Sequence, residues 1–148
     1  MARAQITVTR NFKLAVPRLM SATAMRAVGL ELCVKIENRT RSGRDETGHA
    51  FTQYSEEYAR RVKGGRLAPV TLSHRPVGML NELDVLVATP TRIGIGFRSA
   101  AMEQRAEYHD GLVRNPGVRG SNPLRRFMGV HPSWVEAAVR KIRASLMF

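Results

Sequence analysis

Residues 83–97 read LDVLVATPTRIGIGF and carry the clearest hairpin signal in the chain. Two apolar runs, 83–89 and 92–97, flank a Pro-Thr pair, which is the pattern of two strands joined by a turn. In the second run, isoleucine and phenylalanine alternate with Gly94 and Gly96. A glycine within a strand permits close approach of another backbone. We therefore predict a β-hairpin over these residues.

A strand and a long helix are predicted before the hairpin. Residues 5–9 alternate β-branched and polar side chains, which is typical of a strand. The longest helical pattern runs from Pro17 to about Asn38, and its apolar positions cover more than one stripe. Such a helix is buried on two sides, against its own sheet and against a further surface such as a neighbouring subunit. Gly29 weakens it by roughly 1 kcal/mol relative to Ala, unless close packing needs a small residue there.

Three shorter helices are predicted in the remaining sequence. A serine caps the first, at 55–63, where glutamates lie at the positive end of the dipole and basic residues at the negative end. A second serine caps a helix at 99–108. The motif at 133–136, Ser-Trp-Val-Glu, fits a capping box that opens an amphipathic C-terminal helix.

The length of 148 residues fits one domain, 1–148. Residues 1–16 form an N-terminal strand or arm, and polar, glycine-bearing stretches at 39–52 and 111–124 are predicted as long loops that order on assembly. The start of the chain opens no apolar run of signal-peptide length, and no stretch approaches the ~20 apolar residues of a membrane span. We expect a soluble protein made in a reducing compartment.

The charge is strongly positive, with a formal net charge of +12 at pH 7. Such a surplus attracts nucleic acid or an acidic protein surface and says nothing about fold. Arginine greatly outnumbers lysine, a bias that arises either from a GC-rich genome or from function. Where it is functional, the planar guanidinium suits bidentate contacts to carboxylate or phosphate.

No catalytic, cofactor-binding or metal-binding set can be named from the sequence. Cys33 is the single cysteine, which excludes an intramolecular disulfide, and the four histidines show no metalloprotease spacing. The neighbours Asp45, Glu46 and His49 offer too few oxygen ligands for a hard cation, which favours a solvated polar loop. We expect a protein that is not an enzyme and that needs no cofactor.

An ordered series of motifs resembles the phage virion morphogenesis and tail-completion proteins. It begins with SGRDETGHAF at 42–51, an aromatic residue and a serine-capped basic helix at 54–61. Val-Gly-Met-Leu at 77–80 then leads into the hairpin, and a helix ends on Tyr-His-Asp-Gly. RRFMGV at 125–130 resembles the box with which that family opens its C-terminal helix, here from Pro132. The resemblance covers roughly residues 17 to 146 in unbroken order.

The resemblance implies an α+β fold, with a long N-terminal helix and a C-terminal helix packed on a small, mostly antiparallel sheet. It implies a structural virion protein, assembled in the host cytoplasm, that forms a sixfold or twelvefold ring of identical copies in the phage neck or proximal tail. The ring would complete the tail and join it to the head connector, with tail tube or tail terminator proteins as further partners. It implies no catalysis and no membrane partner.

The resemblance also selects candidate residues. The box that would anchor the C-terminal helix comprises Arg125, Phe127, Met128, Gly129, Val130 and Trp134. The candidates for contacts between subunits or with partner rings are Arg41, Arg44, Arg60, Arg61 and Arg66. Acidic partner surfaces are favoured over the genome DNA in the channel, because a passage for DNA should not hold it through phosphate contacts. The alternative is a basic, non-specific nucleic-acid-binding module.

Overall fold

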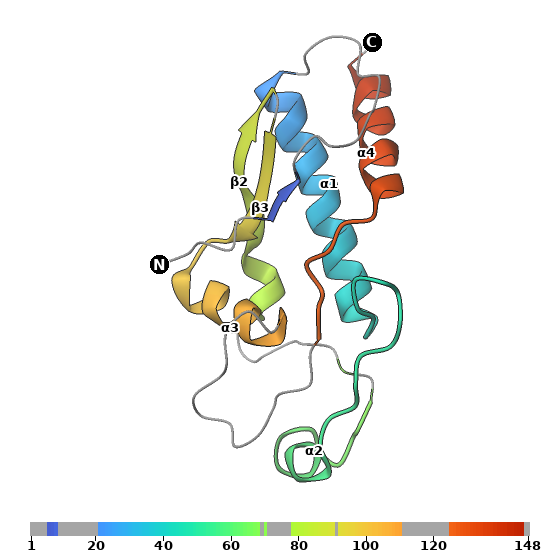
Figure 1. Ribbon diagram of the computed structural model, residues 1–148, viewed down its shortest axis with the longest axis vertical. Coiled ribbons are helices and arrows are strands. Elements are labelled where there is room, and N and C mark those ends of the chain that lie inside the picture. The colour runs from blue at the N-terminus through green and yellow to red at the C-terminus, as the bar shows by residue number, and fades with distance from the viewer. Residues whose placement is uncertain are drawn as a thin grey trace.

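The hairpin forms with its predicted bounds, as β2 (Leu83–Thr89) and β3 (Arg92–Phe97). The structure, a computed structural model, describes residues 6–8, 21–68, 70, 78–90, 92–110 and 125–146. β1 (Ile6–Val8), the predicted N-terminal strand, pairs antiparallel with the other edge of β3, so the strand order is β1-β3-β2 (Figure 1). The register of β2 on β3 shifts between Val85 and Val87. The fold is α+β, as expected.

The long helix, α1 (Ala22–Arg41), begins where Ser21 accepts a hydrogen bond from the N–H of Ala24 at 3.1 Å. The prediction of a loop from residue 39 is wrong, because α1 continues to Arg41. A buried Thr40 hydroxyl donates to the Ile36 carbonyl at 2.7 Å, and the Arg41 guanidinium contacts Glu37 one turn earlier. These contacts, with basic residues at the negative end of the dipole, extend the helix.

α1 lies between two layers, the sheet on one side and α4 (Pro132–Ser145) on the other (Figure 1). The prediction that this helix is buried on two sides is confirmed, but its own C-terminal helix, not a neighbouring subunit, covers the second side. The C-terminal helix thus packs against α1, where the sequence placed it on the sheet. A Cβ at Gly29 would lie 2.6 Å from a methyl group of Val85, so close packing against the sheet requires glycine there.

α4 begins at Pro132, as the resemblance implied, but the predicted capping box is wrong. The ring Nδ1 of His131 accepts the N–H of Ser133 at 3.3 Å and caps the helix. Proline has no N–H and a fixed φ, so it suits the first helical position and moves the start ahead of Ser133. Ser133 therefore lies inside the first turn.

Two shorter elements close the end of the sheet near the hairpin's open ends. The stretch after residue 78 forms the 3-10 helix η1 (Met79–Glu82) with Met79 and Leu80 buried. α3 (Ala100–Asp110) follows β3 and begins where Ser99 accepts the Met102 N–H at 3.4 Å, as predicted. α3 packs against η1 and β3.

Part of the first predicted loop, 39–52, is a hydrogen-bonded turn. After α1, the chain forms a turn in which the backbones of Arg44 and Ala50 form an isolated antiparallel β-bridge. The Asp45 N–H donates to the His49 carbonyl at 2.8 Å. This part of the 39–52 loop is therefore hydrogen-bonded within the single chain. The predicted loop 111–124 and most of the N-terminal segment 1–16 lie outside the described residues.

Candidate assembly interface

One part of the chain projects from the rest, and we call it the arm: residues 52–68, with the remaining described residues as the body (Figure 1). Phe51 and Val70, on either side of the arm, are buried in the core of the body. The N–H of Tyr54 donates to the Leu67 carbonyl at 3.1 Å and closes the base of the arm. Among the described helices and strands, none packs extensively against the arm's helix.

That helix, α2 (Glu56–Val62), matches its prediction. Ser55 accepts the N–H of Tyr58 at 3.3 Å and caps the helix. Acidic residues occupy its first turn and basic residues its last, as the helix dipole favours. Gly64 and Gly65 then take positive φ values of 61° and 84°, a conformation that ends a helix readily only at glycine. Local sequence signals thus specify where the arm's helix begins and ends.

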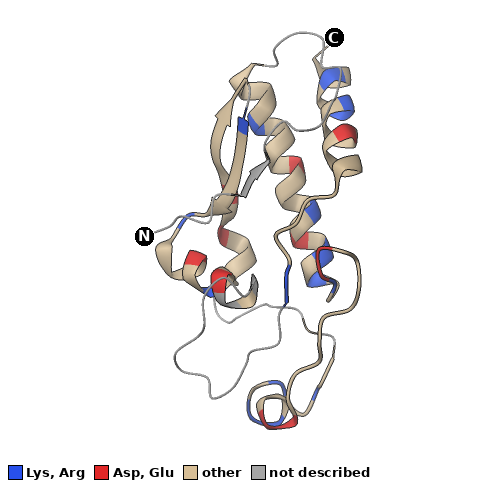
Figure 2. Ribbon diagram, viewed as in Figure 1, with Lys and Arg blue, Asp and Glu red and all other residues tan. Residues whose placement is uncertain are grey.

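Three of the predicted interface arginines lie together on the arm. Arg61 pairs with Glu57 at 3.0 Å, but both side chains are more than 70% exposed, so the pair contributes at most about 0.5 kcal/mol. The guanidinium groups of Arg60 and Arg66 form no hydrogen bond or ion pair with any described residue. Their guanidinium groups are available to a partner outside the chain, and Figure 2 shows the basic positions along α2.

The other two predicted arginines serve the body. Arg41 bonds to Glu37 and, at 2.6 Å, to the side-chain oxygen of Asn81, which ties the end of α1 to η1. Arg44 donates to the Gly48 carbonyl at 2.8 Å within the turn after α1. The side chains of Arg41 and Arg44 thus make contacts within the body, and these two residues do not belong to the group of arginines on the arm.

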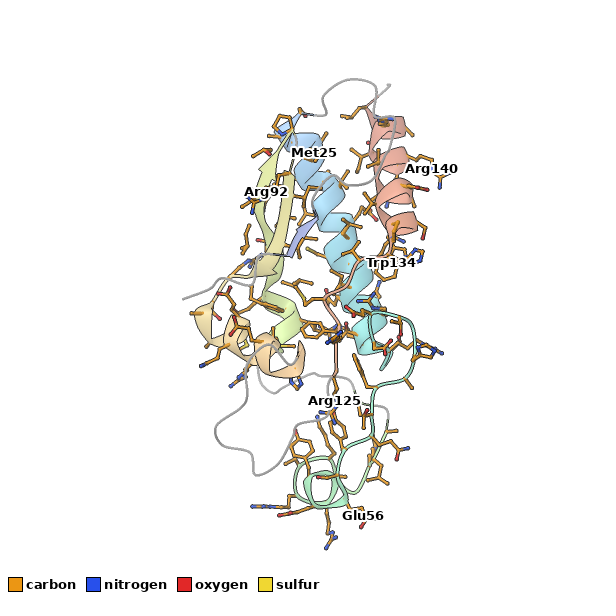
Figure 3. The ribbon with its side chains drawn as sticks, in the orientation of Figure 1. Met25, Glu56, Arg92, Arg125, Trp134 and Arg140 are labelled. Atoms are coloured by element: carbon orange, nitrogen blue, oxygen red, sulfur yellow. The ribbon has the colours of Figure 1, made fainter. Side chains whose placement is uncertain are left out.

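Arg125, from the predicted box, connects body and arm. It donates to the carbonyls of Thr52 and Gln53 at 3.2 and 3.3 Å, and its guanidinium lies 5.3 Å from the ring centroid of Tyr54. Burial lowers the pKa of Arg125, and the neighbouring tyrosine partly offsets this. Figure 3 shows Arg125 at the base of the arm and Glu56 at its far end.

The middle of the box supplies core residues. Phe127 is fully buried, with its ring 6.3 Å from that of Phe97, and Met128 is also buried. A Cβ at Gly129 would lie 2.5 Å from a carboxylate oxygen of Glu46, so this position leaves room only for glycine unless Glu46 moves. Val130 packs against the core from a half-buried position. Phe127, Met128 and Val130 thus all contact the core, and it stays a prediction that the box anchors the C-terminal helix.

Arg39 is the residue that the sequence analysis missed. It donates to the carbonyl of Phe127 and, at 3.3 Å, to that of Glu46, and its guanidinium lies 4.8 Å from the Trp134 ring centroid. It therefore joins the turn after α1, the box and α4. The available signal was helical phase, since Arg39 follows Leu32 and Ile36 by seven and three positions and continues their face.

Trp134, the last box residue, is half-buried and packs against the core from α4 (Figure 3). Lys35 lies over the same ring at 5.7 Å. Cations over an aromatic face contribute about 0.5–1 kcal/mol at partly exposed sites. The tryptophan is thus held between α4's own apolar face and the basic side of α1.

The turn after α1 contains Asp45, Glu46 and His49, which the sequence predicted to form a solvated polar loop and not a cation site. Hydrogen bonds within the turn hold its conformation. Burial pushes the pKa of Asp45 upward, but donors from the Thr47 hydroxyl and from the N–H groups of His49 and Thr47 outweigh it and lower the pKa. The described residues hold no group of three His, Cys, Asp or Glu side chains arranged for a metal ion. Burial raises the pKa of the Cys33 thiol to about 12, so it stays protonated in the core.

Comparisons with models of protein families, with curated proteins and with solved structures find no match to this chain. Of the helices described, none combines the length and apolar character needed to cross a membrane.

Proposed function

We propose that this chain is a structural virion protein of a tailed phage, a ring subunit of the neck or proximal tail that completes the tail and joins it to the head connector. The observation that carries the proposal is the projecting arm. An element that builds little core with its own chain, and that exposes cations and apolar side chains together, is suited to contacts with another molecule.

The contacts between the motifs add support. The box supplies Arg125 to the base of the arm and Phe127 to the core, while Arg39 ties the turn at 44–50 to the box. Segments that are far apart in sequence, and that together carry the family resemblance, are thus physically connected. A rigid body with an arm anchored at one end is a geometry from which copies can build a closed ring.

In this role the protein works by binding alone. Copies associate around the tail axis, partner rings of the head connector and the tail bind above and below, and genome DNA passes through the channel. The arm's cations pair with acidic groups on neighbouring proteins, where a guanidinium forms bidentate bonds to carboxylate. In this role the contact with the passing DNA is weak, because tight phosphate binding would hold the genome in the channel.

The test is electron microscopy of particles produced when the reading frame of this chain is interrupted early. We expect DNA-filled heads separated from tails, or tails with an unfinished head-proximal end. Supplying the intact chain in trans should restore joined particles, whereas a chain with Arg60→Glu and Arg61→Glu should restore few. Arg140→Glu, an exposed change on α4, is the matched control and should restore them fully. Normal, infectious particles without the chain would overturn the proposal.

The second candidate, a non-specific nucleic-acid-binding module, is favoured by one observation: the guanidinium groups of Arg60 and Arg66 have no bonding partner among the described residues. It predicts duplex binding whose affinity falls steeply as salt is raised, because each phosphate contact releases counterions. Binding of a labelled duplex over a salt series measures this. A steep slope that Arg60→Glu and Arg66→Glu together reduce would favour this candidate over ring assembly.

A further inference from the structure

α3 differs from the other described helices in the sign of its charge. Residues 100–110 carry three acidic residues and one arginine, a formal charge of −2, in a chain whose net charge is +12. α1 and α4 each carry more basic than acidic residues, and α2 is balanced. An acidic helix on so basic a protein is a distinct surface, and Figure 2 shows its acidic positions.

Two of these acidic residues form a stripe with no counterion among the described residues. Glu103 and Glu107 lie one turn apart on α3, both half-buried, and neither carboxylate forms a hydrogen bond or ion pair with another described residue. Like charges at this spacing destabilise a helix by about 0.2–0.5 kcal/mol. Other carboxylates of the body do have partners, as where Asp84 contacts Arg26 and Arg98 and where Glu31 contacts Lys141. The stripe therefore has a cost that a cation from outside the chain would remove.

The arm presents the complementary surface. Its residues 52–68 carry four basic and two acidic side chains, a formal charge of +2. The guanidinium groups of Arg60 and Arg66 have no partner among the described residues, and Val62 and Leu67 beside them are 54% and 37% exposed. Cations next to exposed apolar groups match the outer face of α3, where Ala100 and Ala101 are exposed beside the glutamates.

The two surfaces are separate within one chain. α3 packs against η1 and β3, whereas the arm is attached through Arg125 and the Tyr54–Leu67 hydrogen bond. Figure 1 shows α3 at the lower end of the sheet and α2 farther out, beyond the end of the body. No ion pair joins the two surfaces among the described residues.

We propose that the arm of one copy binds the Glu103–Glu107 stripe on α3 of the next copy, with Arg60 and Arg66 paired to the two carboxylates. Because the two surfaces differ, the contact is head-to-tail, and repetition closes a ring if the rotation permits. This inference rests on the proposed ring-forming role for its biological setting and names the surfaces that would form the ring. Exposed ion pairs between copies weaken as salt rises.

A cysteine pair tests the contact while keeping every charge. Val62→Cys on the arm and Gln104→Cys on α3 are both exposed positions, and the native Cys33 is buried. Under mild oxidation at low salt, we expect the double variant to form a ladder of disulfide-linked oligomers on a non-reducing gel, and high salt to shorten the ladder. The matched control, Val62→Cys with Arg140→Cys, should give at least tenfold less of the ladder. An equal ladder in both, or none in either, overturns the proposal.

Charge reversal gives a second test by native mass spectrometry after crosslinking. One variant carries Arg60→Glu and Arg66→Glu, and the other Glu103→Lys and Glu107→Lys. Each alone should lose oligomers, because like charges then meet at the contact, whereas an equimolar mixture should recover alternating oligomers. Failure of the mixture to recover them overturns the pairing of these two surfaces.

The two proposals can fail separately. If particles lacking the chain show heads without tails while the cysteine ladder is absent, the ring role stands and the arm-to-α3 contact is wrong. If the ladder forms while particles lacking the chain are normal, the contact stands and the neck role is wrong. Duplex binding by the arm without any ladder would instead assign the arm's cations to nucleic acid.

Discussion

The body and the arm of this chain are held in place by different forces. The body is a three-layer arrangement in which α1 is buried between the sheet and α4, with Phe127, Leu32 and Ile36 fully enclosed. The arm buries little beyond Ala59 and is attached at its base by polar contacts from Arg125. Burial therefore fixes the body, whereas a few hydrogen bonds fix the arm's direction.

This difference bears on the proposed assembly. Apolar burial of about 25 cal/mol per Å² accumulates into a cooperative core, while single hydrogen bonds contribute about 0.5–1.5 kcal/mol. An arm held by the weaker kind of contact can adjust its direction without loss of the body. This independence of arm and body suits a ring subunit, because binding to the partner surface can then fix the final position of the arm.

The largest effect is expected for Phe127→Ala. Phe127 is fully buried against Phe97, and truncating a buried phenylalanine costs about 3–5 kcal/mol through lost transfer energy and the cavity left behind. Urea denaturation followed by far-UV circular dichroism measures the change in the free energy of unfolding. Tyr58→Ala on the arm is the matched aromatic control and should change it by less than about 1 kcal/mol. Equal losses would show that the arm is part of the core.

A smaller effect is expected for Gly29→Ala in α1. The added Cβ would lie 2.6 Å from Val85 Cγ2 and 3.0 Å from Ile93 Cγ2, and stiff β-branched side chains in a packed core cannot turn away. Overpacking of about 1–3 kcal/mol exceeds the gain of about 1 kcal/mol in helix propensity, so we expect net destabilisation. Thermal unfolding by calorimetry measures it.

The control for that substitution is Gly96→Ala in β3. There the added Cβ would meet Leu86 Cδ1 at 2.7 Å, but Leu86 is 50% exposed and can change rotamer. We therefore expect a smaller change in melting temperature than for Gly29→Ala. The reverse order would mean that the outer face of the sheet is packed more tightly than the face on α1.

The arm's attachment is tested by Arg125→Lys. Lysine keeps the positive charge but cannot donate to the carbonyls of Thr52 and Gln53 while stacking on the Tyr54 ring. We expect amide hydrogen exchange at Tyr54, whose N–H closes the base of the arm, to speed up several-fold. Exchange at Val85 and Ile95 in the sheet should stay unchanged. Equal acceleration in arm and sheet would contradict separate control of the two parts.

How far the sequence predicted this fold depends on how local each signal is. The hairpin and α2 were predicted with close bounds, because a turn pair, a serine cap and two glycines act on adjacent residues. The end of α1 was not, because Thr40 is buried and Arg39 is engaged by the remote Phe127 carbonyl and Trp134 ring. Helical phase indicates the face on which Arg39 lies, but the remote partners of such a residue are not specified by the neighbouring sequence.

The candidate site shows the same limit. Charge and the resemblance grouped five arginines, but geometry divides them. The side chains of Arg41 and Arg44 bond to their own chain, whereas those of Arg60 and Arg66 have no partner among the described residues. Arg125 was selected through the family box, yet its contact with the arm joins residues more than seventy positions apart. Charge can be counted from a sequence, whereas the partner of each charge requires the fold.

The smallest effect concerns the turn after α1, where polar contacts support the body at its surface. Hydrogen bonds from the Thr47 hydroxyl and the His49 N–H, set against the opposing effect of burial, keep the pKa of Asp45 below its ordinary value of about 3.9. A carboxyl whose pKa is lowered by folding stabilises the folded state above its unfolded pKa. That contribution is lost as pH falls through the folded pKa.

We therefore expect Asp45→Asn to flatten part of the acid-range loss of stability below about pH 4, because the amide oxygen still accepts the turn's hydrogen bonds but no longer titrates. Unfolding free energies from denaturant titrations at a series of pH values measure this. Thr47→Val removes one donor while keeping the side chain's shape, so it should shift Asp45's part of the loss to higher pH. Identical acid profiles for the native chain and both variants would mean that the titration of Asp45 contributes nothing to the stability of the body.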